Sequence, residues 1–305
     1  MDAPEAVYTT LRTVLPFEWS RPAFMIHALL IVALLAPLCA ALGVQVVNFR
    51  LAFFSDAVSH SAFTGVVLGY LLVPVFTAAY PAVPHWDRIL PPITLVLFGL
   101  LVGTGITLVR RRTDLSSDTV IGVFFAAVIA TGIAVLSRLN LRADFERYLY
   151  GSIVTAGWAD VCIVAALAAA AAVYLAATFN SLLLFGLHEP LARSRGLRTR
   201  FHDVAFSLLV ALVVCVGIRV VGLLLVTALL IVPAAAARNI ARSAGGMFGW
   251  SALFGLVGGT SGLIGSFYAE TAPGASIILV ASLFFVVTLL IAPLRGRPSR
   301  LLFSS

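Results

Sequence analysis

Lysine is absent from this sequence of 305 residues, and all 20 of its basic side chains are arginines. A Walker A loop uses a lysine to reach nucleotide phosphates, and Schiff-base enzymes use a lysine amine, so the sequence excludes both. If ATP drives this protein, another chain binds the ATP. The sequence also lacks an H-E-x-x-H pair, and no histidine follows His202. Neither a zinc protease of that type nor an intramembrane serine protease built on Ser261 therefore fits.

Charged residues are scarce as well. They make up 11% of the chain against 61% hydrophobic residues, and the mean hydropathy is +1.07. These values lie outside the range of soluble globular domains and predict an all-α, polytopic membrane protein. The formal charge of +7 comes from arginines in short loops between apolar spans. In that position they set the topology and do not indicate a nucleic-acid partner.

Cysteine is rare, with three residues at Cys39, Cys162 and Cys215, each inside an apolar run. Their odd number and their spacing fit small buried side chains better than disulfides or a zinc site. The chain starts with the acidic segment Met1 to Glu5, which has no basic region leading into a cleavable apolar stretch. We therefore expect no signal peptide and expect the first apolar span to stay in the mature chain.

Long apolar runs dominate what is present. A spanning helix needs about 20 residues, and by this measure the sequence predicts eight or nine spans. Several are short or interrupted by glycine and proline, notably the pair on either side of Arg219, and such interruptions are tolerated where other helices or a cavity cover the backbone. The predicted spans are 27–47, 61–76, 93–109, 119–136, 161–178, 204–218, 220–237, 247–267 and 275–294.

Arginine clusters predict the topology. If the clusters are cytoplasmic, a nine-span chain has its N-terminus outside and its C-terminus inside. Arg138, Arg142 and Arg147 fit least well, because this topology places them outside beside two acids, and one re-entrant span would reduce the count to eight. The cytoplasmic arginines are Arg50, Arg110 to Arg112, Arg193 to Arg200, Arg238, Arg242 and Arg295 to Arg300, and the outer loops contain Asp87, Asp144, Glu146 and Glu270.

Asp56 and His60 are the most informative polar residues. They lie four apart in an apolar stretch, so a helix places both on one face. Ionisable residues are expensive inside a bilayer and are candidates for function there. A carboxylate and a neutral imidazole suit zinc and manganese, and incomplete coordination lets a transported ion leave. The alternative is an internal hydrogen bond that locks a broken helix.

Other polar and small residues have more ordinary interpretations. Small-xxx-small spacings such as Gly65 to Gly69 indicate close helix packing. Asp118, at the start of an apolar run, suits a cap at a helix N-terminus. His85 lies on a predicted outer loop and is either a metal collector or incidental. His27, His188 and His202 lie at predicted membrane or loop boundaries, and we assign them no role as metal ligands.

The segment 187–203 is the most polar part of the second half of the chain. Pro190 suits the first turn of a helix and Gly196 its end, so we predict a short cytoplasmic helix of about two turns. This segment is either a solvated, topology-setting loop or a docking helix for a soluble partner. In the second case Leu191 and Ala192 would form the apolar contact, with Arg193 and Arg195 as its rim.

Six segments in register carry a family resemblance. The sequence over residues 25–294 resembles, in the order and spacing of these segments, the permease subunits of the ABC-3 family of metal importers. The segments are Asp56-x-x-x-His60 with Gly65, Ser117 to Gly122, Tyr148 to Ser152, Glu189 to Gly196, Val221 to Arg238, and Phe267 to Gly274.

The resemblance implies the transmembrane subunit of an importer for Zn²⁺, Mn²⁺ or Fe²⁺, with no permanently bound cofactor. Such permeases form homodimers in the bacterial cytoplasmic membrane, take metal from an extracytoplasmic binding protein, and dock two copies of a separate ATPase, so the chain itself is not expected to be an enzyme. The implied organisation is an outer segment 1–24, a permease domain 25–294 with a coupling helix at about 188–197, and a cytoplasmic tail 295–305.

The resemblance also implies site residues. The metal residues are Asp56 and His60, either duplicated across a dimer axis or joined by Glu270 from the last inter-helix loop. The ATPase-docking residues are Glu189, Pro190, Leu191, Ala192, Arg193 and Gly196. The alternative function is a secondary transporter that is driven by an ion gradient and needs no ATPase, in which Asp56, His60 and Glu270 relay protons.

Overall fold

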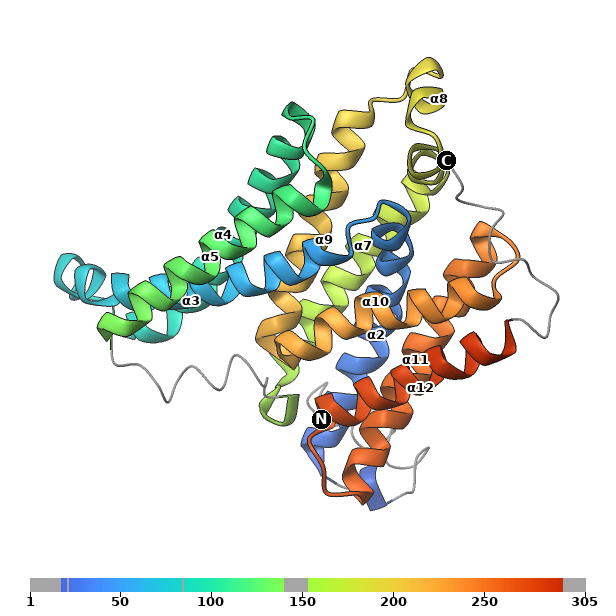
Figure 1. Ribbon diagram of the computed structural model, residues 1–305. Coiled ribbons are helices and arrows are strands. Elements are labelled where there is room, and N and C mark those ends of the chain that lie inside the picture. The colour runs from blue at the N-terminus through green and yellow to red at the C-terminus, as the bar shows by residue number, and fades with distance from the viewer. Residues whose placement is uncertain (1–17, 21, 84, 140–152, 293–305) are drawn as a thin grey trace. The chain divides into compact units, whose positions relative to one another are not determined.

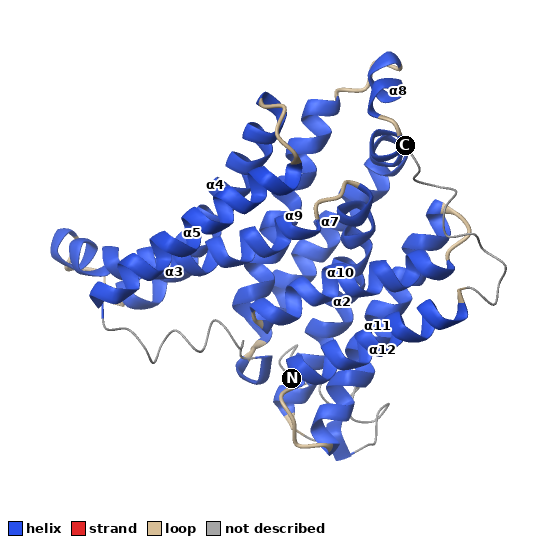
Figure 2. Ribbon diagram, in the orientation of Figure 1, coloured by secondary structure: helices blue, strands red, loops and turns tan. Residues whose placement is uncertain are grey.

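The computed structural model describes residues 18–20, 22–83, 85–139 and 153–292. These residues form helices joined by short connections, as Figure 2 shows. Within these ranges, nine helices are long and apolar enough to cross a membrane. The predicted all-α membrane bundle is therefore confirmed, with nine spans among the described residues. The long helices are α2 (Ala23–Asn48), α3 (Ala52–Ala79), α4 (Trp86–Arg112), α5 (Ser117–Leu139), α7 (Trp158–Leu187), α9 (Thr199–Val221), α10 (Leu223–Ile240), α11 (Ala244–Tyr268) and α12 (Pro273–Ile291).

The described residues also contain three short elements: the 3₁₀ turns η1 (Glu18–Ser20) and η2 (Ile153–Thr155), and the short helix α8 (Glu189–Ser194). Each predicted span corresponds to one long helix, except that span 220–237 begins in the last residues of α9 before it continues as α10. Most helices extend beyond the apolar run, as α4 does by including Arg110 to Arg112. The last helix instead ends at Ile291, three residues before the predicted boundary.

Proline does not break these helices. Pro37, Pro74 and Pro233 all lie inside continuous helices. The break near Arg219 is real, but it lies at Gly222, where φ is 94°. An L-residue rarely adopts that conformation, so glycine is what allows α9 to end and α10 to begin with a single residue between them.

The chain divides into two compact units, which are described separately. Unit 2, Asn48–Thr227, contains α3, α4, α5, α7, α8 and α9. In this unit α3, α4 and α5 run side by side, and α4 also packs on α9 (Figure 1). The short α8 packs on α7 and α9, the two helices that it joins.

Unit 1 combines Met1–Val47 with Ala228–Ser305 and contains α2, most of α10, α11 and α12. Glycines let its helices approach closely. A Cβ added at Gly255 would lie 2.7 Å from the Ala36 carbonyl oxygen on α2, and one at Gly262 would lie 2.5 Å from the Ile277 Cα on α12. In unit 2, a Cβ at Gly65 would lie 2.6 Å from the Thr94 carbonyl oxygen on α4. The packing role predicted from the small-xxx-small spacings is confirmed at Gly65 and Gly262, and Gly255 has the same role.

Some predictions fall outside the described residues. These are the motif Tyr148 to Ser152, the loop residues Arg142, Asp144, Glu146 and Arg147, the tail 295–305, and most of the segment 1–24. The proposed domain boundaries remain predictions.

Candidate metal site

Helix α3 carries Asp56 and His60. A tight turn precedes the helix, with Arg50 at φ 56°, and the Phe54 N–H donates to the Leu51 carbonyl oxygen at 3.0 Å. The helix then runs unbroken from Ala52 to Ala79. Asp56 and His60 are one turn apart and half-buried, amid buried neighbours such as Ala57, Val58 and Ser59. The predicted shared face is therefore present.

The alternative role of the pair, an internal hydrogen bond that stabilises a broken helix, does not match this geometry. The helix is continuous through the pair. The ion pairs and hydrogen bonds found among the described residues do not include one between Asp56 and His60. Both side chains thus lie on one helix face, and no ion pair between them is found among the described residues.

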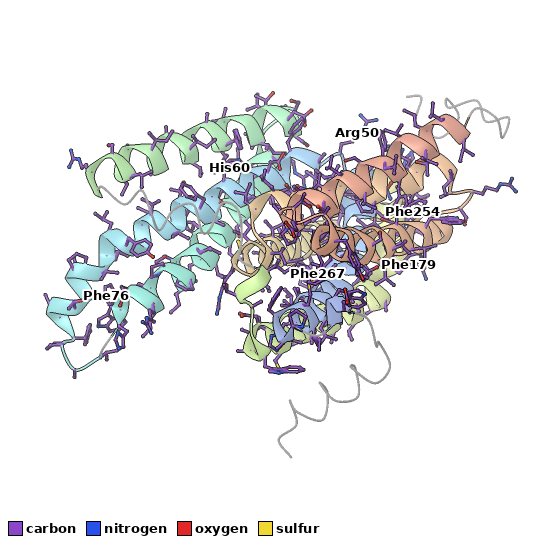
Figure 3. All side chains as sticks on the ribbon, turned by 90° about the horizontal axis from the view of Figure 1, so that it is seen from below. Arg50, His60, Phe76, Phe179, Phe254 and Phe267 are labelled. Atoms are coloured by element: carbon purple, nitrogen blue, oxygen red, sulfur yellow. The ribbon has the colours of Figure 1, made fainter. Side chains whose placement is uncertain are left out.

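Phe125 of α5 contacts the imidazole of His60. The two ring centroids are 5.0 Å apart with an interplanar angle of 83°, an edge-to-face arrangement. Figure 3 shows His60 on the side of α3 that faces α5. Such aromatic contacts are worth about 0.5–1.5 kcal/mol beyond the buried area. Phe125 therefore limits the orientations of His60.

The same side of α3 is held to α5 one turn further on. The Thr64 hydroxyl donates to the Val128 carbonyl oxygen at 3.0 Å, and a Cβ at Gly132 would lie 2.5 Å from the Thr64 Oγ1. Sequence reasoning missed Phe125, Thr64 and Gly132 as residues that position the pair. A separation of more than 60 residues leaves no local signal for such contacts.

A third protein ligand is not assembled beside the pair. Within each unit, the described histidine, cysteine, aspartate and glutamate residues form no group of three that could hold a metal ion. The Ser59 Oγ is fully buried without a hydrogen-bond partner in the part of the chain that is described. A lone hydroxyl adds little to a zinc site, so Asp56 and His60 are the two candidate metal ligands that the described residues of unit 2 offer here.

Glu270 belongs to unit 1, in the connection between α11 and α12. It is exposed and has a φ of 52°, which is uncommon for a residue with a side chain. The next residue, Thr271, shares a hydrogen bond of 2.7 Å with Ser276. Its role as a third metal residue remains a prediction.

Helix α8 lies where the docking helix was predicted, and it is shorter than two full turns. The His188 Nδ1 accepts a hydrogen bond from the Leu191 N–H at 3.4 Å, and Pro190 occupies the first turn. Gly196 follows the helix with φ 76°. Capping thus explains His188 without any ligand role.

The exposed side of α8 differs from the prediction at one position. Leu191 is 43% exposed, but Ala192 is fully buried. Ala192 therefore anchors the helix to its own unit and offers no contact surface. Arg193 donates to the Glu189 Oε1 at 2.7 Å on the exposed side, and Arg195 is exposed as well.

The remaining polar candidates, Asp118 and His85, lie at the starts of helices. Ser116 caps α5, because its Oγ accepts from the Thr119 N–H at 3.1 Å, while Asp118 lies in the first turn. His85 precedes α4 with φ 66° and is exposed, next to Trp86. Trp86 belongs to an aromatic group with Phe76 and Tyr80, and Figure 3 shows Phe76 toward the end of α3 far from His60.

Residues 21–292 match the ABC 3 transport family. The high-affinity zinc uptake system membrane protein ZnuB of Haemophilus influenzae is 30% identical over 263 residues, which cover 86% of this chain and 95% of ZnuB. The manganese import system permease protein ScaB of Streptococcus gordonii is 28% identical over 271 residues, which cover 88% of this chain and 92% of ScaB.

A solved structure agrees with the sequence matches. PsaBC from Streptococcus pneumoniae in complex with Fab superposes with a TM-score of 0.74 at 27% identity, covering 95% of this chain and 96% of the matched chain. The nine apolar helices and these matches identify a multi-pass membrane protein. The family match extends over nearly the whole chain, and the chain therefore belongs to the ABC 3 transport family.

Proposed function

We propose that this protein is the transmembrane permease subunit of an ATP-driven importer of divalent metal ions in the bacterial cytoplasmic membrane. Its substrate is Zn²⁺, Mn²⁺ or Fe²⁺, which passes from an extracytoplasmic binding protein to the cytoplasm. The observation that carries the proposal is the Asp56 and His60 pair, half-buried on one face of a membrane helix in a chain of this family. The names of the zinc and manganese relatives support the choice of substrate.

Asp56 and His60 contact the metal as it passes. Carboxylate and imidazole are ligands that all three metals accept, so the pair does not select among them. Two side chains leave the coordination shell open, and water, Glu270 or the same pair from a second copy in a homodimer completes it. An open shell suits a transport site, because a fully enclosed ion would leave slowly.

The chain works with partners that supply energy. In the homodimer, two copies of a separate ATPase dock, one against each α8. The contact uses the exposed Leu191 and the charged residues Glu189, Arg193 and Arg195. Pro190 and Gly196 define the ends of the docking helix, and Ala192 holds it in place. The absence of lysine agrees with ATP binding on another subunit. Residues 25–294 form the permease domain, with 1–24 outside and 295–305 in the cytoplasm.

The test of this function is the metal content of cells that lack the protein, measured for all divalent ions by mass spectrometry. We expect one of zinc, manganese or iron to fall when that metal is scarce, and a copy of the gene on a plasmid to restore it. Unchanged content of every divalent metal under scarcity of each would contradict the proposal.

The energy source needs its own measurement, because a gradient-driven transporter would give the same metal content. We expect uptake of the radioactive metal to stop on ATP depletion and to survive a proton uncoupler when ATP is maintained. The reverse pattern would favour the proton relay through Asp56, His60 and Glu270.

Docking is tested by the double variant Leu191→Asp with Arg193→Glu. We expect it to lose the ATPase in a detergent pull-down, because it places an acid in the apolar contact and reverses a rim charge. Ala82→Asp, an exposed position on the loop between α3 and α4, is the control and keeps the ATPase. Retained binding in the double variant would refute the docking role of α8.

A further inference from the structure

A buried ion cluster ties α4 to α9 at the end of unit 2 that carries α8. The Arg110 Nη2 donates to both carboxylate oxygens of Asp203, at 2.6 and 2.7 Å, and the Arg111 Nε donates to the Asp203 Oδ2 at 2.6 Å. The Arg111 Nη2 also donates to the Thr199 carbonyl oxygen at 3.0 Å. The side chain of Asp203 is 3% exposed and each arginine 15%. The last turn of α4 is thereby fixed to the first turns of α9.

The helix ends favour these charges. The arginines lie in the last turn of α4, near its negative dipole end, and Asp203 lies near the positive dipole end of α9. The cluster nevertheless keeps one net positive charge in a nearly buried place. Burying ions is costly, and apolar residues of similar size often serve stability equally well. Holding the end of α4 at a fixed position on α9 therefore explains the cluster better than a gain in folding stability does.

Three phenylalanines extend the cluster to the start of α3. The guanidinium of Arg111 lies 6.0 Å from the ring centroid of Phe185, near the end of α7. Phe185 contacts Phe49 edge-to-face at 5.1 Å, and Phe49 contacts Phe206 of α9 at 5.2 Å. Phe49 precedes α3 by three residues, and Asp56 follows in the second turn of that helix.

Helix α8 is attached to this assembly from both sides along the chain. It follows Phe185 at the end of α7 and precedes Asp203 near the start of α9. Its Ala192 is buried, and α8 packs on both of these helices. A displacement of α8 therefore moves the end of α7 and the start of α9. Phe185 and Phe206 on these helices contact Phe49, and Asp203 binds the end of α4.

We propose that Phe49, Arg110, Arg111, Phe185, Asp203 and Phe206, here named the ion-ring cluster, transmit movement of α8 to the start of α3 and so to Asp56 and His60. This inference rests on the proposed function. The cluster moves as one body during the ATPase cycle, so that closure of the ATPase shifts the metal pair. Contiguous packed side chains and ion pairs are the physical means by which such coupling travels.

The test uses the permease in complex with its ATPase and binding protein, reconstituted in liposomes, and measures radioactive Zn²⁺ or Mn²⁺ uptake together with ATP hydrolysis. The variant is Phe49→Leu, which removes both ring contacts while keeping an apolar side chain. We expect an assembled complex that hydrolyses ATP but moves about tenfold less metal per ATP. Phe49→Tyr keeps the ring and should retain wild-type coupling.

Phe53→Leu is the matched control, because Phe53 lies in the first turn of α3 but is 63% exposed and outside the cluster. Arg111→Lys is the second variant. It keeps the charge but replaces the guanidinium, whose Nε and Nη2 reach Asp203 and the Thr199 carbonyl oxygen separately, by a single nitrogen, so uptake per ATP should also fall.

Wild-type uptake per ATP in both Phe49→Leu and Arg111→Lys would overturn the proposal. Loss of ATPase binding in step with loss of uptake would also overturn it, since the cluster would then serve assembly alone. Failure of the proposed function gives a different result, because wild-type liposomes would then show no ATP-dependent metal uptake.

Discussion

At the scale of single residues, the contact between Phe125 and His60 sets the orientation of the imidazole. The variant Phe125→Leu removes an edge-to-face contact of about 0.5–1.5 kcal/mol, so we expect the KM for metal uptake to rise by about 2- to 10-fold. Protein level and ATPase binding should not change. The measurement is the concentration dependence of radioactive metal uptake.

Phe124→Leu is the control for that prediction. Phe124 belongs to the same helix, but its ring lies near Gly105 of α4, where an added Cβ would come within 3.0 Å. An equal rise of KM in both variants would mean that α5 packing in general, and not the ring beside His60, is responsible.

The sequence predicted part of this arrangement and not the rest. The four-residue spacing of Asp56 and His60 is a local property of a helix, so their shared face followed directly. Phe125 and the bond from Thr64 to Val128 depend on which side of α5 packs against α3. That choice is made by tertiary packing, and residues more than 60 positions apart carry no trace of it.

At the scale of elements, the joint between α9 and α10 depends on Gly222. Its φ of 94° and ψ of 162° lie in a region that is essentially restricted to glycine. We expect Gly222→Ala to lower the free energy of unfolding by about 1–3 kcal/mol, measured as loss of the folded fraction in a detergent and denaturant titration.

Gly249→Ala serves as the comparison for the joint. Gly249 lies inside α11, and an added Cβ would meet nothing within 4 Å. Replacing a helical glycine by alanine there should be neutral or stabilising by about 0.5–1 kcal/mol. Equal stability of the two variants would show that the φ at Gly222 is not required.

Element boundaries illustrate where sequence reasoning is limited. The predicted spans 204–218 and 220–237 place a break at Arg219. In the structure α9 continues to Val221, and Arg219 lies 3.6 Å from Asp160 at the start of α7. A partner on another helix thus allows the charge to remain inside the helix. Pro190 and Gly196 did predict α8, since caps act within a few residues.

At the scale of the whole molecule, the arginines of unit 2 support the predicted topology. Arg110 and Arg111 at the end of α4 meet Asp203 at the start of α9, next to α8, so two arginine clusters share one end of this unit. Arg219 and Asp160 pair where α9 ends and α7 begins. The side of the membrane on which each end lies remains a prediction.

Cysteine labelling tests that sidedness. The test uses a chain in which Cys39, Cys162 and Cys215 are replaced. In cells whose outer membrane is permeabilised but whose cytoplasmic membrane is intact, we expect Ala82→Cys and Ala269→Cys to react with a membrane-impermeant maleimide. Arg195→Cys should react only after the cytoplasmic membrane is permeabilised. Labelling of Arg195→Cys in intact cells would contradict an inside location for α8.

The most direct test of the central claim is metal uptake by liposomes that contain the assembled transporter with Asp56→Asn or His60→Gln. Mutating a residue that only supports a metal ligand typically lowers metal affinity or activity by about tenfold or more. Loss of a ligand itself should lower metal uptake at least as much, so we predict a fall of at least about tenfold in uptake. ATPase binding should remain normal, and the controls Asp118→Asn and His27→Gln should transport as the wild type does. Normal uptake in both Asp56→Asn and His60→Gln would contradict the assignment of this pair as the metal contact.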